Sequence, residues 1–186
     1  TKCDVVSKKL YLTGGIGATG QGEAFGDAYE LPNETAYAET CAAIALVFWA
    51  RRMADLDPDS RYADVMERAL YNGVLSGVSW GGRQLFYVNP LAAHPQPALR
   101  GIPGGKTRHH RRQDWFGCAC CPPNIARLLA SLGGYVYSQG PSEARVHLYV
   151  GGQAELTIGG RAVVLRQKTA YPWRERVRID VAPVAA

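Results

Sequence analysis

The pattern of apolar residues changes about three quarters of the way along this 186-residue chain. Before about residue 138, helical stretches alternate with long segments rich in Gly, Pro and aromatic residues. Beyond residue 144, short apolar runs are separated by Gly151-Gly152 and Gly159-Gly160, which is typical of β-hairpins. The runs expected to be strands are RVHLYV, AELTI, RAVVLRQ and RVRIDV. The pattern therefore predicts a mainly α chain with a smaller β part at its carboxy-terminal end.

The helical periodicity predicts three helices. The first extends from about Thr40 to Leu56, where the sequence DPDS ends it, and the second from about Arg61 to Ser76. The third begins after Pro122 and Pro123, because proline suits the first turn of a helix. Its apolar positions form one stripe, made of Ile125, Leu128, Leu129 and Leu132.

Two connecting segments, residues 11–38 and 77–122, are long for a compact domain. Three helices cannot close a core alone, and such segments need other elements to lie on. The strands likewise stop at APVAA without a clear partner sheet. We therefore expect the chain to be a piece of a larger protein, with apolar surface left uncovered on its helical part.

Composition and charge narrow the classes of partner. Apolar residues make up 47% of the chain, which is ample for a packed core. The most apolar stretch, CAAIALVFWA at 41–50, is about half as long as a membrane span and runs into Arg51 and Arg52. The first residues contain no apolar signal-peptide core. We expect a cytoplasmic location and no membrane partner.

Basic residues exceed acidic ones, which gives the chain a net charge of +5 at pH 7. Part of this charge comes from the run KTRHHRRQ at 106–113. No interleaved aromatic residues and no nucleic-acid module accompany the run, so a solvated loop is favoured and no nucleic-acid partner is expected.

Three of the five cysteines lie within four positions, in FGCACCPPN at 116–124. Disulfides are rare in cytoplasmic proteins, and the adjacent Cys120 and Cys121 could pair only under strain. Metal binding is the stronger interpretation, although the sequence lacks the second CxxC or HxxxH pair of a zinc finger. Cys41, two residues after Glu39 in the sequence ETC, could complete a zinc site of one carboxylate and three sulfurs.

The spacing of Glu39 and Cys41 places a condition on that site. Residues two apart in a regular helix point about 200° away from each other, so both could bind one ion only from the start of the helix. We expect the chain to enter the helix at or just after Glu39, with Thr40 as a fair N-cap. The alternative is that Cys41 is a small buried residue and Glu39 a first-turn acid favoured by the helix dipole.

Three separated stretches carry a family resemblance: LTGGIGATGQGEAFGDAYELPNETAYAETCA, FYVNPL and CCPPNIARLLASLGGYVYS. In this order they resemble the β-L-arabinofuranosidase family of glycoside hydrolases, the family numbered 127, over essentially the whole chain. The resemblance implies the carboxy-terminal half of an (α/α)6 catalytic barrel at residues 1–140 and the start of a β-sandwich domain at residues 141–186. It also implies a retaining glycoside hydrolase that removes β-linked L-arabinofuranose from arabino-oligosaccharides.

The resemblance also implies roles for single residues. The zinc ligands that it implies are Glu39, Cys41, Cys120 and Cys121. Cys120 would be the nucleophile, Glu23 of GEAFG the acid/base, and Tyr87 of FYVNP a residue of the sugar pocket. Zinc would ionise a thiol whose usual pKa is about 8.5, giving a thiolate at neutral pH. Cys3 and Cys118 match no ligand.

The family's pattern is incomplete in this chain. Histidines that hold the furanose come from the first half of the family's barrel, and the histidines present here match none of them; they are His94, His109, His110 and His147. A zinc-stabilised structural or carbohydrate-binding fragment without turnover is therefore the alternative function. The expected partner is an arabinofuranose-containing oligosaccharide, and a homodimer stays an open alternative to a monomer.

Overall fold

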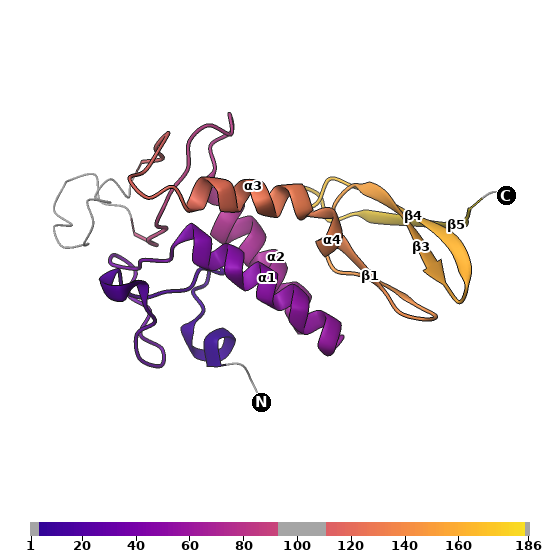
Figure 1. Cartoon of the computed structure of the whole chain (residues 1–186), viewed down its shortest axis with the longest axis horizontal. Helices are drawn as coiled ribbons and strands as arrows, with labels where there is room; N and C mark the ends of the chain where they lie inside the picture. The colour runs from indigo at the N-terminus through magenta and orange to yellow at the C-terminus, as the bar shows by residue number, and fades with distance from the viewer. Residues whose placement is uncertain (1–3, 93–110, 185–186) are drawn as a thin grey trace. The chain divides into compact units, whose positions relative to one another are not determined.

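The computed structural model describes residues 4–92 and 111–184. The chain divides into two compact units, Thr1–Leu129 and Ala130–Ala186. The first unit holds α1 (Thr40–Leu56), α2 (Ser60–Arg68) and most of α3 (Cys121–Ser131), as Figure 1 shows. The second unit consists mainly of strands. The expected order, helices followed by a β part, is confirmed.

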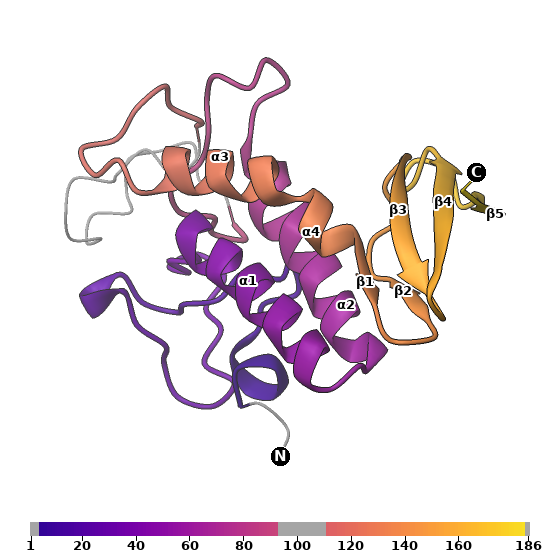
Figure 2. The ribbon, with the colours of Figure 1, turned by 45° about the vertical axis from the view of Figure 1, so that its right-hand side comes forward.

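The helices α1 and α2 pack side by side in the first unit (Figure 2). α1 begins and ends at the predicted residues. Its buried residues recur at helical spacing and are Thr40, Ala43, Ile44, Leu46, Val47, Ala50 and Ala54. The predicted second helix is confirmed in extent but is α-helical only to Arg68. It continues as a π-helix, η3 (Ala69–Val74), and a 3-10 turn, η4 (Leu75–Gly77).

The amino-terminal segment is fixed to the second helix by a close backbone approach. Gly14 has a φ of 81°, and a Cβ atom at this position would lie 2.7 Å from the backbone nitrogen of Ala69. Because only glycine tolerates both conditions, Gly14 allows the segment to lie directly on η3. Three residues before Gly14, Tyr11 packs in a buried cluster with Ala36 and Ala38, which lie just before α1.

Residues 37–40 enter α1 beside residues 86–89, which lie far away in the sequence. Glu39 and Val88 form an antiparallel bridge, and the Thr40 amide donates to the carbonyl of Tyr87 over 2.9 Å. The Ala38 amide donates to the carbonyl of Gly17 over 2.9 Å. The ETC and FYVNP sequences are thus neighbours in space.

The second unit contains two antiparallel sheets. β1 (Tyr137–Gln139) pairs with β2 (Ala144–Val146), and β3 (Gly152–Ile158), β4 (Arg161–Thr169) and β5 (Val177–Pro183) form a sheet in that order. A short helix, α4 (Gly133–Val136), precedes them. Gly159 and Gly160, with φ of 59° and 75°, form the predicted hairpin turn between β3 and β4.

Two details of the β prediction are wrong. Gly151-Gly152 do not join two paired strands, because β2 pairs with β1 and Gly152 is the first residue of β3. Of the run RVHLYV, only the first two residues lie in a strand, since the amides of His147 and Leu148 instead donate to the carbonyl of Val136. Within the described ranges, no helix has the length and apolar character needed to cross a membrane.

Candidate functional site

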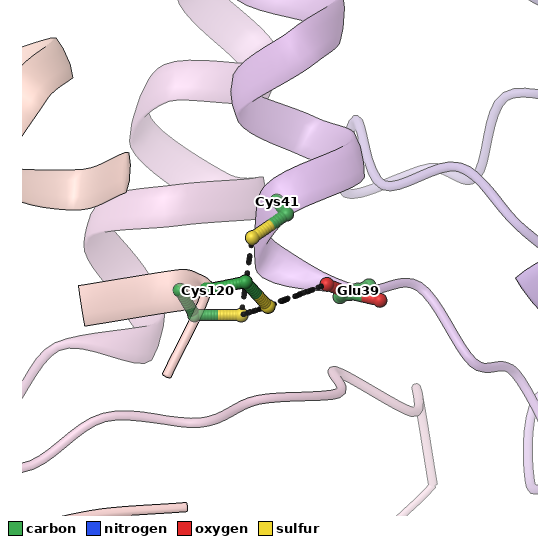
Figure 3. Close-up of side chains that lie close together, drawn as sticks. Glu39, Cys41 and Cys120 are labelled. Atoms are coloured by element: carbon green, nitrogen blue, oxygen red, sulfur yellow. Dashed lines mark hydrogen bonds between the residues drawn. The ribbon is translucent and has the colours of Figure 1, made fainter. Parts of the chain in front are cut away.

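Four side chains that the sequence singled out converge in the first unit (Figure 3). We call them the Glu/Cys cluster; they are Glu39, Cys41, Cys120 and Cys121. Their ligand atoms all lie within 4.8 Å of one another. Cys41 Sγ is 3.4 Å from Cys121 Sγ, and Cys120 Sγ is 3.3 Å from Glu39 Oε1. The expected convergence is confirmed, and this group could bind a metal ion.

The cluster is built from the amino-terminal ends of two helices. Glu39 precedes α1 with an extended backbone (φ −61°, ψ 139°), so its side chain and that of Cys41 need not follow helical spacing. Cys121 is the first residue of α3, and Cys120 lies just before it. The prediction of Thr40 as N-cap is wrong by one residue: Thr40 is already helical, and its hydroxyl donates to the carbonyl of Phe86 over 2.8 Å.

This placement suits negatively charged donors. The first turn of a helix carries a partial positive charge, which favours carboxylates and thiolates. Pro122 and Pro123 occupy the first turn of α3, where a missing amide hydrogen costs no helical hydrogen bond. The sequence CCPPN is therefore at once a helix start and a source of two sulfur donors.

The three cluster cysteines have different pKa values because each has different surroundings. The pKa of Cys41 is lowered to about 7 by its hydrogen bond with Cys121, and further by those with Asn124 and Cys120. Burial raises the pKa of Cys120 to about 12. The hydrogen bond with Cys41, together with burial, raises the pKa of Cys121 well above its usual value. Cys41 is thus the most acidic of the three thiols, and a bound metal ion would supply the charge needed to ionise all three sulfurs.

Two polar side chains outside the cluster contact its sulfurs. The amide of Asn124, in the first turn of α3, donates to Cys41 Sγ over 3.0 Å. The hydroxyl of Tyr87 lies 3.0 Å from Cys120 Sγ. Burial, and then the hydrogen bond with Cys120, raises the pKa of Tyr87, so this hydroxyl keeps its proton at neutral pH. Its ring packs edge-on against Phe116, with centroids 5.3 Å apart.

Glu23 lies outside the cluster, on a 3-10 turn, η2 (Gln21–Glu23). It is exposed, and its φ of 52° is unusual for a residue other than glycine. The hydroxyl of Tyr37 donates to Glu23 Oε1 over 2.6 Å. Tyr37 is buried, and its ring packs edge-on against that of Tyr87, with centroids 6.5 Å apart. Glu23 is thus connected to the neighbourhood of Cys120 through two tyrosines.

Among the described residues, the remaining cysteine and histidine are Cys118 and His147, and neither is one of the four cluster donors. Cys118 is exposed. Cys3 and the histidines at 94, 109 and 110 lie outside the described residues, as does most of the basic run 106–113. Arg112, near the end of that run, donates to the carbonyl of Gly77 and lies over the ring of Phe86. His147 hydrogen-bonds Ser138 in the second unit.

Sequence reasoning missed three residues that shape the site. Asn124 stands in the CCPPN motif, and its place in the first turn of α3 was the available signal. Asn89 stands in FYVNP and donates through its amide to Ala38 O and Thr40 Oγ1 over 3.0 and 3.1 Å, which fixes the start of α1. Tyr37 gave no signal, because nothing in the sequence brings it to Glu23.

The motifs and this geometry agree with comparisons to known proteins. The family profile described as the catalytic domain of GH127 β-L-arabinofuranosidase matches residues 3–134. The chain therefore belongs to the GH127 β-L-arabinofuranosidase family of glycoside hydrolases. A non-reducing end β-L-arabinofuranosidase from Bifidobacterium longum subsp. longum is 41% identical over 184 residues, which cover 96% of this chain and 27% of the relative.

Solved structures of the same family are similar to the chain. A GH127 β-L-arabinofuranosidase from Geobacillus stearothermophilus T6 is 52% identical with a TM-score of 0.88, covering 97% of this chain and 28% of the other. A second GH127 β-arabinofuranosidase is 46% identical with a TM-score of 0.83, covering 95% and 26%. The chain thus spans about a quarter of the length of these relatives.

Proposed function

We propose that the protein containing this chain is a retaining glycoside hydrolase that releases β-linked L-arabinofuranose from arabino-oligosaccharides. The observation that carries the proposal is the convergence of the Glu/Cys cluster in a chain of the GH127 family. The activity named for the relatives supports the choice of sugar. The contact between Tyr87 and Cys120 supports a chemical role for that sulfur in addition to metal binding.

We propose that the metal is zinc. A tetrahedral site with zinc–sulfur distances of about 2.3 Å separates its donor atoms by about 3.8 Å. The separations here include 3.4 Å and 3.7 Å between sulfurs, and 3.3 Å and 3.8 Å from sulfurs to Glu39 Oε1. Three sulfurs and one carboxylate are also a soft donor set that suits zinc better than magnesium or calcium. Bound zinc would keep Cys120 ionised at neutral pH.

In the first step, the thiolate of Cys120 attacks the anomeric carbon, and a C–S bond forms as the glycosidic C–O bond breaks. Glu23 in its acid form gives its proton to the leaving oxygen. The hydroxyl of Tyr87 donates a hydrogen bond to the Cys120 sulfur and orients it. The products of this step are a thioglycosyl enzyme and the shortened oligosaccharide.

In the second step, Glu23 in its carboxylate form takes a proton from water, and the water oxygen attacks the anomeric carbon. The C–S bond breaks and the thiolate of Cys120 is restored. Each displacement inverts the anomeric carbon, so the two together retain its configuration. Cys120 would thus take the place of the second carboxylate that most retaining glycosidases use.

We also propose the architecture that goes with this function. Residues 1–140 would form part of an (α/α)6 catalytic barrel, and residues 141–186 would begin a β-sandwich domain. The similarity to GH127 structures over about a quarter of their length supports this division. A cytoplasmic location and a homodimer are further proposals, to be checked by fractionation and by light scattering.

The test is an assay of the full-length gene product that contains this chain. We expect it to hydrolyse p-nitrophenyl β-L-arabinofuranoside and a β-linked arabinofuranosyl disaccharide, but not the α-anomer of the chromogenic substrate. Proton NMR should show β-L-arabinofuranose as the first product, and elemental analysis should find about one zinc per chain.

Two other outcomes would change the assignment. An α-configured first product would replace the double displacement by a single inverting one. Binding of arabinofuranosides without turnover would favour the alternative function, a zinc-stabilised carbohydrate-binding or structural fragment.

A further inference from the structure

The turn that carries Glu23 offers its side chain little packing. Glu23 is exposed at the end of η2, and a Cβ atom added at the neighbouring Gly22 would meet no heavy atom within 4 Å. Its own backbone is in the left-handed region, where a residue other than glycine is rarely found. A carboxylate on such a turn has many rotamers available, so packing alone does not fix its direction.

Tyr37 constrains this carboxylate through a hydrogen bond. Its side chain is 3% exposed, and its hydroxyl donates to Glu23 Oε1 over 2.6 Å, the usual length of a hydrogen bond from a hydroxyl to a carboxylate. The backbone around it is held on both sides, because its carbonyl accepts from the amide of Asn89 over 3.3 Å and the next amide, of Ala38, donates to Gly17 O. Glu23 is therefore tied to a rigid part of the first unit through the side chain of Tyr37.

The direction of this bond has a chemical consequence. A carboxylate can only accept hydrogen bonds, so the Tyr37 hydroxyl is the donor and Glu23 Oε1 the acceptor. When Glu23 is in its acid form, Oε1 accepts this hydrogen bond and the acidic proton resides on Oε2. One carboxyl oxygen is thereby assigned to anchoring and the other to proton transfer.

We infer that Tyr37 is a positioning residue for the acid/base Glu23, and that its hydroxyl fixes which carboxyl oxygen faces the leaving group. This inference rests on the proposed function. It differs from the role of Tyr87, whose hydroxyl contacts the sulfur of Cys120. The two tyrosines pack against each other, and each holds one of the two proposed reacting groups.

The test is Tyr37→Phe in the full-length gene product, with Tyr11→Phe as matched control. Tyr11 is also buried in the first unit, and its hydroxyl donates to the carbonyl of Pro32 over 3.2 Å. Each variant thus loses the hydroxyl of a buried tyrosine and keeps its ring. The measurement is kcat/KM on the arabinofuranosyl disaccharide and on p-nitrophenyl β-L-arabinofuranoside, together with zinc content and Tm.

For Tyr37→Phe we expect kcat/KM to fall about tenfold on the disaccharide and less than about twofold on the p-nitrophenyl glycoside. The sugar leaving group needs the proton, whereas p-nitrophenolate leaves without it. Zinc content should stay at the wild-type value, and Tyr11→Phe should affect both substrates equally.

Three other outcomes would overturn either the role of Tyr37 or the proposed function. If wild type hydrolyses both substrates and Tyr37→Phe lowers both rates by the same factor, as Tyr11→Phe does, Tyr37 is a structural residue and the inference is overturned alone. The inference is also overturned if Tyr37→Phe fails to fold, because a residue needed for folding is not primarily a positioning one. If wild type hydrolyses neither substrate, the proposed function fails and the inference with it.

Discussion

Glu39 and Cys121 are buried residues at the starts of α1 and α3, whereas Glu23 is exposed on a three-residue 3-10 turn. The cluster donors are positioned by the starts of two helices: Asn124 donates to Cys41 Sγ, and Asn89 donates to the carbonyl of Ala38, next to Glu39. Glu23 is held through the hydroxyl of Tyr37. Cys120 of the cluster and Glu23 are proposed to act on the same bond, yet they are positioned by very different means.

The difference follows from what each group has to do. The donors that take no part in bond making, Glu39, Cys41 and Cys121, must hold the ion in place through the whole reaction, and the start of a buried helix suits this. An acid/base gives up a proton and takes one back, so it must meet both the leaving oxygen and water. An exposed turn whose carboxylate accepts a hydrogen bond from Tyr37 gives this access. Changes in the cluster should thus affect metal binding, stability and turnover together, and changes at Glu23 only the proton transfers of the two steps.

The largest effect is expected from Cys120→Ser in the full-length gene product. Because the thiolate is lost, kcat/KM should fall at least about a thousandfold on the disaccharide and on p-nitrophenyl β-L-arabinofuranoside alike. In wild type, an arabinofuranose that carries a haloacetamide should label Cys120 and leave Cys121 and Cys118 unmodified, as mass spectrometry can establish. Labelling of Cys121 or Glu23 instead would mean that the nucleophile is wrongly assigned.

The next largest effect is expected from Cys41→Ser, which removes a sulfur donor while leaving the proposed nucleophile in place. Zinc binding should weaken at least about a hundredfold, and Tm should fall, because binding energy at a structural site is folding energy. Isothermal titration and thermal unfolding measure the two effects. The matched control is Cys118→Ser, an exposed cysteine outside the cluster. Equal losses in both variants would argue against a metal site at the cluster.

Glu23→Gln should separate the two regions most cleanly. On the disaccharide, kcat/KM should fall about a hundredfold or more, since the leaving oxygen receives no proton. On the p-nitrophenyl glycoside the first step should slow less than about tenfold, as measured by the release of p-nitrophenolate before steady state. Zinc content and Tm should match those of wild type, and a loss of zinc would show that Glu23 and the cluster are not independent.

The smallest effect is expected from Asn124→Ala. The variant loses the amide that donates to Cys41 Sγ, so zinc affinity should fall about tenfold and the free energy of unfolding by about 1 kcal/mol. Competition with a chromogenic chelator measures the affinity. Asn72→Ala, at an exposed position on η3, is the matched control. Unchanged affinity in Asn124→Ala would show that Glu39 and the three sulfurs alone determine binding.

The sequence predicted the cluster better than the turn of Glu23, and the reason is physical. The bounds of α1 follow from a local signal, the helical spacing of apolar residues that DPDS ends. The adjacent thiols of Cys120 and Cys121, taken together with the ETC sequence, indicated a metal site. As expected, the chain enters the helix just after Glu39, whose backbone is extended, although the N-cap is Glu39 and not Thr40. Thr40 lost that role because its hydroxyl donates to Phe86, a contact with a residue distant in the sequence.

Other features depended on contacts that no local pattern reveals. The link from Tyr37 to Glu23 spans a segment without regular periodicity, so its hydrogen bond could not be anticipated. The change from α-helix to π-helix after Arg68 coincides with the close approach of Gly14 to Ala69. β1 was missed because Tyr137–Gln139 is only three residues long and pairs across a turn that contains Pro141.

The Glu/Cys cluster joins two helix starts that lie 80 residues apart in the chain, from Cys41 to Cys121. A metal ion held there would act as a cross-link that closes this loop. By the chain-entropy estimate used for disulfides, closing a loop of that length disfavours the unfolded chain by about 4 to 5 kcal/mol. A protease that cuts the polypeptide once within the loop would then leave both pieces attached through the ion, and a chelator would remove that link.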